Sequence, residues 1–367
     1  MNGHTHFQWL DLIRFLAAFL VIASHYRAVF LPEYSDLMPS QHNPVIFGFY
    51  FLTRLGNEAV MIFFVLSGFL VGGKLIERCQ NRTFNLTQYT VDRSVRIMLP
   101  LISALLLQLI VEIVYDKPIE PLRILGNLLS LQGIVVNSEI VVLWSLSYEV
   151  WFYIIAGAIA VWMLAKTKKQ IIWSYILIGT SFLVFSHLKA YYIFIWLTGA
   201  LVYRHIPIKS DTKKIIVSLL FSLMLIPLMQ LSSGSRTSFH VTDILGPHSH
   251  SIFEVAFGLL FGVFISQIVV YSPRHKWSVT LNRIGTKLAA FSYTLYLVHL
   301  PLRDLMFYFG AEKAEVLNSY TIILYFAFLL IGLFGSYLIY LIFERNTKKV
   351  KGFIFNLISQ KRKDQQQ

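Results

Sequence analysis

Apolar runs long enough to cross a lipid bilayer recur along almost the whole chain, from Trp9 to Phe343. A transmembrane helix needs about 20 consecutive, mostly apolar residues. Hydrophobic residues make up 56% of the 367 residues and charged residues only 14%, whereas about a quarter of the residues of a soluble domain are charged. The sequence therefore predicts an all-α integral membrane protein and excludes a soluble globular fold.

Ten spans in a single bundle are predicted from these runs. They cover residues 9–30, 45–71, 97–115, 140–164, 171–185, 191–203, 215–231, 252–271, 288–309 and 321–343. The fifth and sixth spans can also be read as one long tilted helix, but the basic segments on both sides of the pair favour two crossings. Of the 32 Lys and Arg residues, 23 follow the even-numbered spans, which predicts that both termini are cytoplasmic. Residues 1–350 are predicted to form one transmembrane domain, and residues 351–367 a basic, polar cytoplasmic tail.

The net charge of +13 does not indicate a nucleic-acid partner, because the basic residues cluster at the predicted membrane edges. The single cysteine, Cys79, excludes an internal disulfide and a thiolate metal cluster, since each needs at least two thiols. No predicted span contains the His spacing typical of a zinc site. His248 and His250 are predicted to be a solvated pair in a loop, and we expect no bound metal.

The first predicted span contains three ionisable residues, Asp11, Arg14 and His25. Each costs at least ~2.5 kcal/mol at the centre of a membrane helix. Asp11 and Arg14 are three residues apart and can pair on one helical face. Arg14 and His25 share a face and are separated along the axis by about 16 Å. They form a functional stripe, or Arg14 reaches the interface beside Asp11 while His25 is a hydrogen-bonded interior residue.

Two further spans contain polar residues near their predicted outer ends. The fourth opens with Trp144, Ser147, Tyr148 and Glu149. Glu149 is either a partner for a histidine or a sugar hydroxyl, or part of an interfacial Trp and Tyr belt. In the second span, Glu58 at the predicted outer end is either a contact for a substrate or a solvated residue. Ser67, Gly68, Gly72 and Gly73 indicate close packing against a neighbouring helix.

Arg93 and Arg96 stand three residues apart at the predicted start of the third span. Guanidinium groups form charge-assisted bonds with phosphate, and a helix N-terminus offers free amide groups. The pair is a candidate phosphate site, unless it only anchors the helix at lipid head groups. In the ninth span, Tyr296 and His299 share one face, and His299 is either catalytic or a satisfied interior histidine.

Together these segments resemble the acyltransferase family 3 membrane proteins of bacteria, from Asp11 to about Glu344. The motifs are Asp11 with Arg14-x10-His25, Phe63–Leu70, Arg93-x-x-Arg96-x-x-x-Pro100, Trp144–Glu149 and Ser292–His299. The resemblance implies a multi-pass protein of the bacterial cytoplasmic (inner) membrane, of the type without a fused hydrolase-like domain. It implies O-acylation, usually O-acetylation, of an extracytoplasmic glycan such as O-antigen, capsule or exopolysaccharide, with cytoplasmic acyl-CoA as the donor. Expected partners are acyl-CoA, a glycan or lipid-linked glycan, and membrane lipids.

The resemblance and the spacing together suggest a role for each candidate residue. The catalytic residues are expected to be His25, Arg14 and Glu149, with His25 acting as general base or transient acyl carrier. Acyl-CoA, a co-substrate rather than a tightly bound cofactor, is expected to contact Arg93, Arg96 and Arg14. The acceptor is expected to contact Trp144, Ser147, Tyr148 and Glu58. Supporting residues are expected to be Asp11, Ser67, Tyr296 and His299, with Ser67 or Ser147 as donors to the oxyanion.

The sequence departs from the usual family pattern at two positions. Tyr148 stands where a small or apolar residue is usual, and Glu58 stands where an apolar residue or aspartate is frequent. Both differences bear on substrate choice. The alternative function is a polytopic transporter or flippase for a glycan or small anionic substrate, since intramembrane Asp, Arg and His also suit a relay. The sequence lacks the repeated halves that many transporters contain, which favours the enzyme.

Overall fold

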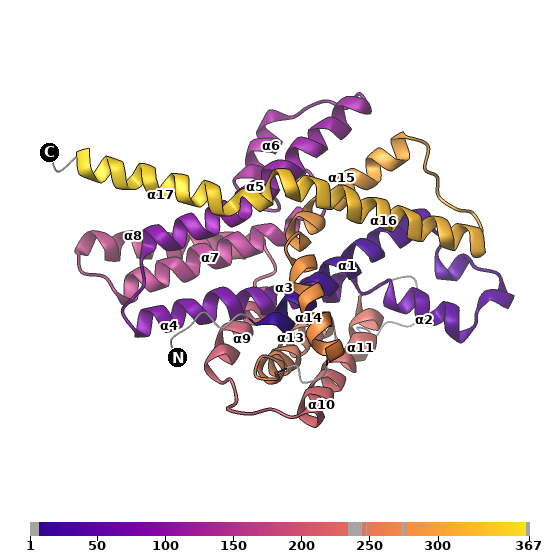
Figure 1. Ribbon diagram of the computed structural model, residues 1–367, viewed down its shortest axis with the longest axis horizontal. Helices are drawn as coiled ribbons and strands as arrows, with labels where there is room; N and C mark the ends of the chain where they lie inside the picture. Colours follow the sequence, from indigo (N-terminus) through magenta and orange to yellow (C-terminus); the bar gives the residue numbers. More distant parts are fainter. Residues whose placement is uncertain (1–6, 234–243, 247, 273–275, 365–367) are drawn as a thin grey trace. The chain divides into compact units, whose positions relative to one another are not determined.

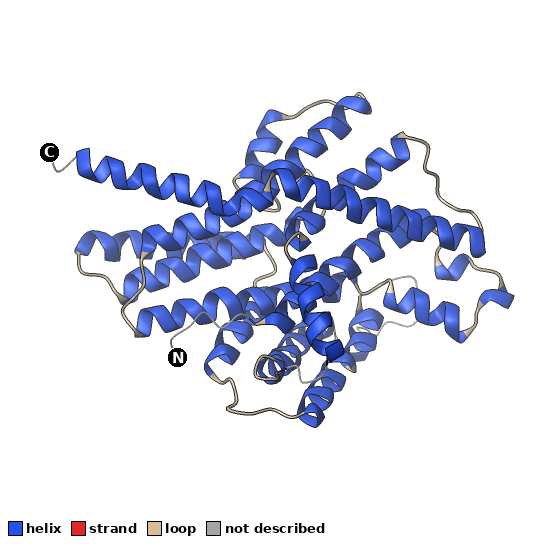
Figure 2. Ribbon diagram, in the orientation of Figure 1, coloured by secondary structure: helices blue, strands red, loops and turns tan. Residues whose placement is uncertain are grey.

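A computed structural model of the chain describes residues 7–233, 244–246, 248–272 and 276–364. These residues form helices joined by loops and contain no β-strand (Figure 2). Eight helical stretches within them are long and apolar enough to cross a membrane, judged by length and composition. They begin at Gln8, Gly56, Leu86, Leu143, Lys168, Thr212, Ser249 and Ser319. The predicted fold class, an all-α membrane protein, is confirmed.

The helices follow one another along the chain as labelled in Figure 1. In order, they are α1 (Gln8–Phe30), η1 (Tyr34–Asp36), η2 (Pro39–Gln41), α2 (Pro44–Leu52), α3 (Gly56–Ser67), η3 (Gly68–Gly73), α4 (Lys74–Gln80), α5 (Leu86–Val114), α6 (Pro121–Leu128), α7 (Leu143–Met163), α8 (Lys168–His187), α9 (Tyr192–Arg204), α10 (Thr212–Leu223), α11 (Leu225–Ser232), α13 (Ser249–Ile268), α14 (Lys276–Ala289), α15 (Ser292–Tyr308), α16 (Ser319–Ile342), η4 (Glu344–Asn346) and α17 (Thr347–Asp364). The segment η3 is a π-helix, a local widening of the helix that is often found at functional sites.

Each of the ten predicted spans overlaps one or more helices, but the sixth and the ninth correspond to α9 and α15, which are not among the eight long apolar stretches. The second predicted span also begins too early. Its first part is a separate short helix, α2. This helix begins at Pro44, and the side chain of Asn43 caps its N-terminus. The helix ends at Leu52, and the next begins at Gly56. Arg54, the one charged residue in the intervening turn, interrupts the apolar run. The second span therefore starts at Gly56 rather than at residue 45.

The chain divides into two compact units. The first consists of residues Met1–Ala17, Asn57–Phe84 and Tyr148–Ala289. Within it, α3 and η3 pack against α9 so closely that a Cβ atom on Gly68 would lie 1.8 Å from the carbonyl oxygen of Trp196. A Cβ atom on Gly199 would lie 2.0 Å from the carbonyl oxygen of Val65. The predicted close packing at the glycines of the second span is confirmed.

The second unit consists of residues Ala18–Gly56, Asn85–Ser147 and Ala290–Gln367. Within it, α15 packs against α5 and α16, and α17 packs along α5. Lys351 of α17 pairs with Asp92 of α5 at 2.8 Å. The buried Tyr325 hydroxyl of α16 donates to the carbonyl oxygen of Ala23 at 3.0 Å. The first pair joins α17 to α5, and the second bond joins α16 to the part of α1 that follows Ala17.

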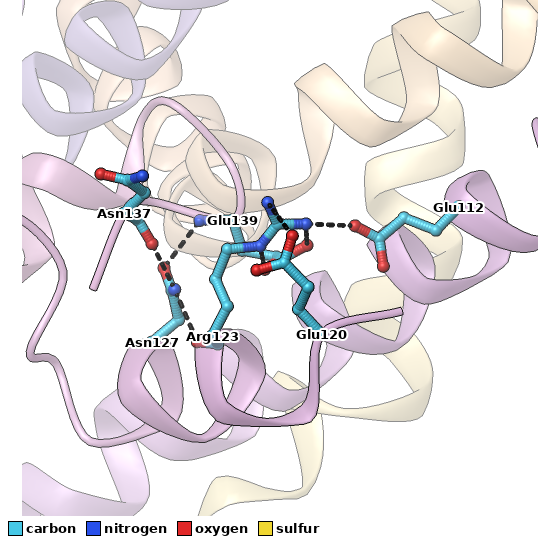
Figure 3. Close-up of polar contacts among 6 residues, drawn as sticks. All are labelled: Glu112, Glu120, Arg123, Asn127, Asn137 and Glu139. Carbon is cyan, nitrogen blue, oxygen red and sulfur yellow. Dashed lines mark hydrogen bonds and ion pairs between the residues drawn. The ribbon is translucent and has the colours of Figure 1, made fainter. Parts of the chain in front are cut away.

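A folded connection joins α5 to α7 within this second unit (Figure 3). Arg123 of α6 is its centre: the guanidinium lies 2.6 Å from Glu139, 3.0 Å from Glu112 and 3.5 Å from Glu120. The Asn127 side chain donates to the carbonyl oxygens of Arg123 and Asn137, and accepts from the Glu139 amide. These bonds fix the path of the chain into α7, where several candidate residues lie.

Candidate functional site

A pair of histidines joins α1 to α15 in the second unit. Nδ1 of His25 lies 2.8 Å from Nε2 of His299, and the two rings stack with centroids 5.1 Å apart. His299 is completely buried, whereas His25 is half-buried. The structure thus brings together two predicted site residues that are 274 positions apart.

The hydrogen bonds determine which nitrogen of each ring carries a proton. Nδ1 of His299 lies 3.1 Å from the carbonyl oxygen of Leu295, and a carbonyl oxygen can only accept. Nδ1 of His299 is therefore the donor, which leaves Nε2 of the neutral ring as an acceptor. Nδ1 of His25 must then donate to it. The remaining nitrogen of His25, Nε2, carries a lone pair that can take a proton or attack a carbonyl carbon.

Two tyrosine side chains hold α15 in place around this pair. The Tyr26 hydroxyl of α1 donates to the carbonyl oxygen of His299 at 3.0 Å. The Tyr296 hydroxyl lies 2.7 Å from the hydroxyl of Ser145 and 3.2 Å from the carbonyl oxygen of Val142. Tyr296 therefore ties α15 to the start of α7, one helical turn before His299.

The first unit contains the predicted pair on α1. Nη1 of Arg14 lies 3.4 Å from Oδ1 of Asp11, as their spacing predicted. The Arg14 and Asp11 side chains are 23% and 14% exposed, so neither side chain is fully covered by the protein.

A chain of hydrogen bonds in the first unit ends on Glu149 of α7. The Trp196 indole N–H of α9 donates to the Ser67 hydroxyl at 3.1 Å. The Ser67 and Tyr153 hydroxyls lie 3.0 Å apart, and the Tyr153 hydroxyl donates to Oε1 of Glu149. The indole can only donate and an ionised carboxylate can only accept. The Ser67 hydroxyl therefore donates to the Tyr153 hydroxyl, which donates to Glu149. Ser67 and Glu149, both predicted site residues, belong to one network.

The sequence was compared with models of known protein families, with curated proteins and with solved structures. The model of the acyltransferase family 3 domain matches residues 7–341, which is nearly the whole chain. The chain belongs to acyltransferase family 3. No curated protein and no solved structure matches it. The family assignment, together with the apolar helices, identifies a multi-pass membrane acyltransferase and confirms the resemblance seen in the sequence.

Several other predicted residues of this family 3 acyltransferase have partners inside the protein. The Ser147 hydroxyl is completely buried and lies within bonding distance of the carbonyl oxygens of Ser130 and Gln132, at 3.1 and 2.8 Å. The Tyr148 hydroxyl, also buried, accepts from the Lys189 amide at 2.7 Å. The contact of Ser147 and Tyr148 with the acceptor stays a prediction.

Glu58 and Trp144 complete the predicted substrate contacts. Glu58 is only 5% exposed, so the interpretation of Glu58 as a solvated carboxylate was wrong. Trp144, in the first turn of α7, is half-buried. The contact of either residue with the acceptor stays a prediction.

The position of the two arginines also differs from the prediction. Because α5 begins at Leu86, Arg93 and Arg96 lie two or more turns inside the helix, where the amide groups already bond within it. Free amide groups of a helix N-terminus therefore cannot assist phosphate binding there. Nη1 of Arg96 pairs with Glu344, whose side chain is 2% exposed, while Arg96 retains 35% exposure. Any phosphate contact has to come from the guanidinium groups.

Sequence reasoning missed several residues that organise these sites. Tyr153 follows Glu149 by four residues, a spacing that places both on one face of α7 and was available in the sequence. Glu344, which also accepts from the amide and hydroxyl of Thr294, lies 248 positions from Arg96 and had no local signal.

A second polar cluster, in the first unit, was also missed. Glu254 of α13 is completely buried and accepts from Tyr191 at 2.5 Å and from Asn57 at 3.1 Å. His250 lies 3.5 Å from Glu254 and 2.9 Å from the Ser232 hydroxyl. His250 is therefore part of α13 and engaged within the protein, so its prediction as a solvated loop residue was wrong.

Proposed function

We infer that this acyltransferase moves an acetyl group from cytoplasmic acetyl-CoA to a hydroxyl of an extracytoplasmic glycan such as O-antigen, capsule or exopolysaccharide. The protein would lie in the bacterial cytoplasmic (inner) membrane with both termini in the cytoplasm, as the distribution of Lys and Arg indicates. The observation that carries the proposal is the free Nε2 atom of His25, fixed by the bonds from His25 to His299 and from His299 to Leu295.

His25 Nε2 can serve the transfer in either of two ways. As a general base, it accepts the proton of the acceptor hydroxyl while the oxygen attacks the thioester carbonyl carbon. The C–S bond then breaks, and the thiolate of CoA takes the proton from His25. As a nucleophile, Nε2 attacks the thioester carbonyl carbon, the C–S bond breaks and CoA leaves as a thiolate, which gives an acyl-imidazole. The acceptor oxygen then attacks the acyl carbon, the C–N bond breaks, and the hydroxyl proton balances the charge of the thiolate released before. Both routes require the same tautomer of His25.

The donor side of the proposal rests on three arginines. Arg93 and Arg96 lie three residues apart on α5, so their side chains can meet one phosphate-bearing ligand. Arg96 keeps 35% of its exposure in its ion pair. Arg14 is held by Asp11 at 3.4 Å and would contact the pantetheine arm or a phosphate group. The negative charge of CoA complements all three.

The acceptor side of the proposal rests on Glu149 and Trp144. A carboxylate held by the Tyr153 hydroxyl can accept further hydrogen bonds from sugar hydroxyls. Trp144 offers an aromatic face for a pyranose ring. Ser67 is the candidate to stabilise the oxyanion of the thioester carbonyl, and its hydroxyl proton, donated to Tyr153 in the network described above, would turn toward the oxyanion during the reaction.

The test uses membranes that contain the native chain, the His25→Ala variant or the His187→Ala variant. His187 is an exposed histidine at the end of α8 and serves as the matched control. Acetyl-CoA labelled in the acetyl group is supplied, and the label is followed into protein and extractable glycan while free CoA thiol is measured. We expect labelled glycan with the native chain and His187→Ala, and none with His25→Ala.

Each other outcome has a definite meaning. Equal labelling with His25→Ala would refute the role of His25. Label that stays on the native protein after acid quenching, and that His25→Ala lacks, would assign the nucleophilic route. If no membrane consumes acetyl-CoA although acceptor glycan is present, the acetyl transfer reaction is wrong, and movement of glycan without covalent change would favour a transporter.

A further inference from the structure

The segment between α1 and α2, residues 31–43, is a folded surface of the second unit rather than an open loop. It contains the two short helices η1 and η2. The Tyr50 hydroxyl donates to the carbonyl oxygen of Pro32 at 2.8 Å, and Nε2 of His42 lies 3.2 Å from the carbonyl oxygen of Tyr34. The segment therefore keeps its shape without help from a ligand.

A second segment, residues 310–318, is bonded to both ends of the first. The Ala314 amide donates to the carbonyl oxygen of Phe30 at 2.9 Å. The Gln41 side-chain amide donates to the carbonyl oxygen of Leu317 at 2.6 Å. The two segments therefore form one surface, which begins at the C-terminal end of α1. We call it the α1-end surface.

Three aromatic rings lie together where this surface meets the start of α2, and they differ in how far they are exposed. The rings of Tyr34 and His42 stack with centroids 4.9 Å apart, and Phe47 meets Tyr34 edge to face at 6.0 Å. His42 and Phe47 are exposed, and Tyr34 is half-buried. The face of an aromatic ring carries partial negative charge and attracts the C–H groups of a sugar ring. A fixed pair of rings offers such a face at little entropic cost.

A carboxylate is held beside these rings. Oε2 of Glu33 pairs with Nη1 of Arg27 at 3.1 Å, and the side chains retain 35% and 8% of their exposure. The Arg27 guanidinium lies 5.4 Å above the ring of Tyr50, and its buried Nε atom has no hydrogen-bond partner in the part of the chain that the structure describes. Arg27 thus fixes Glu33 from the inside, while the carboxylate stays accessible to hydroxyl donors from the outside.

The charges of the α1-end surface select among sugars. Its carboxylates are those of Glu33, Asp36, Glu312 and Glu315, against the cations of Lys313 and the buried Arg27. Negative charge therefore predominates on the exposed face. Like charges repel at the short distances of a binding contact, where salt screening is weakest. An acidic glycan would meet repulsion here, whereas hydroxyl groups would find acceptors.

We propose that the α1-end surface is the docking site for the acceptor of the transfer proposed above, and that this acceptor is an uncharged, hydroxyl-rich glycan rather than an acidic one. The inference rests on the proposed function, because it takes the acceptor to be a glycan. Phe30, where the surface begins, follows His25 by five residues of α1, about 8 Å along the helix axis. A glycan docked there would have to extend a hydroxyl over this distance, past the buried Tyr26 and Phe30, to reach Nε2 of His25.

Binding is tested without catalysis, in the full-length His25→Ala protein reconstituted in nanodiscs. The probes are maltohexaose, cellohexaose and chitohexaose as neutral glycans and hexagalacturonate as an acidic one, measured by saturation-transfer NMR. We expect at least one neutral probe to bind and the acidic probe not to bind. Added substitutions Glu33→Gln and Tyr34→Ala should each weaken binding at least tenfold, whereas Tyr34→Phe should retain it.

The control for nonspecific aromatic effects is Tyr175→Ala, which removes an exposed tyrosine of α8 in the first unit and should bind like the parent protein. The proposal is overturned if hexagalacturonate binds as tightly as the neutral probes, if Glu33→Gln and Tyr34→Ala bind unchanged, or if no neutral probe binds. This readout is separate from the labelling assay with acetyl-CoA. Failure of acetyl transfer with intact binding would count against the proposed function alone, and intact transfer with no neutral-glycan binding would count against the docking site alone.

Discussion

His299 is expected to control the activity of His25 without touching substrate. The substitution His299→Asn tests this. The amide NH2 of asparagine can take the place of Nδ1–H and donate to the Leu295 carbonyl oxygen. The asparagine side chain is too short, however, to place an acceptor where Nε2 of His299 now lies. The Nδ1–H group of His25, which now donates over 2.8 Å, then loses its partner. The substitution His299→Gln is the matched control, since its longer side chain places an oxygen near the former Nε2.

The size of the effect follows from the lost hydrogen bond. A buried donor left without an acceptor costs about 1–3 kcal/mol. Because each 1.36 kcal/mol corresponds to a factor of ten, the population of the tautomer with a free Nε2 should fall by about 5- to 160-fold. The rate of acetyl transfer should fall by the same factor. His299→Gln should lie much closer to the native rate.

The assay is the initial rate of label transfer from acetyl-CoA to glycan, normalised to the amount of folded protein in the membrane. Normalisation matters because His299 is completely buried, so both variants can lower the yield. Native transfer by His299→Asn would refute the tautomer argument. Equal losses in His299→Asn and His299→Gln at equal protein levels would also refute it, because only one of them removes the acceptor.

Two further outcomes are expected. Tyr153→Phe removes the donor to Glu149, a charge-assisted bond worth about 1.5–3 kcal/mol, and should lower transfer about tenfold or more, measured by the same labelling assay; an unchanged rate would show that Glu149 needs no such bond. Gly68→Ala should abolish folded protein, as judged by size-exclusion chromatography in detergent, because its Cβ would lie 1.8 Å from the Trp196 carbonyl oxygen; Gly179→Ala, with open space around its Cβ, should fold normally.

The apolar runs predicted the helices well because a bilayer imposes length and composition on every span. The apolar runs predicted wrong helix boundaries where a helix begins or ends at a residue that hydropathy does not mark. The sequence Pro44–Leu52 is almost wholly apolar, so it was joined to the following span although it forms its own helix. Conversely, α5 begins at Leu86 in a polar stretch, which a search for apolar runs passes over. Helix ends are decided by capping and by turns, not by hydropathy.

The site could be predicted only where its contacts are local. Asp11 and Arg14 were paired from their spacing of three residues, and that spacing holds. His25 and His299 were both singled out, but nothing in the sequence said that they touch, since their contact depends on how α1 packs against α15. The link from Trp196 through Ser67 to Tyr153 joins three helices and is equally invisible. Tyr153 beside Glu149 and His250 beside Glu254 were missed although their spacing of four residues is a local signal.

The backbone contact between η3 and α9 sets a limit on how this enzyme can move. Where two helices meet through side chains, rotamer changes allow them to slide or separate in small steps. Between Gly68 and Gly199 no side chain intervenes, and backbone atoms of one helix lie against those of the other. The segments η3 and α9 must therefore move together as one rigid element. Any opening that admits a donor or an acceptor during turnover therefore has to take place at other helix contacts, where side chains rather than backbones meet.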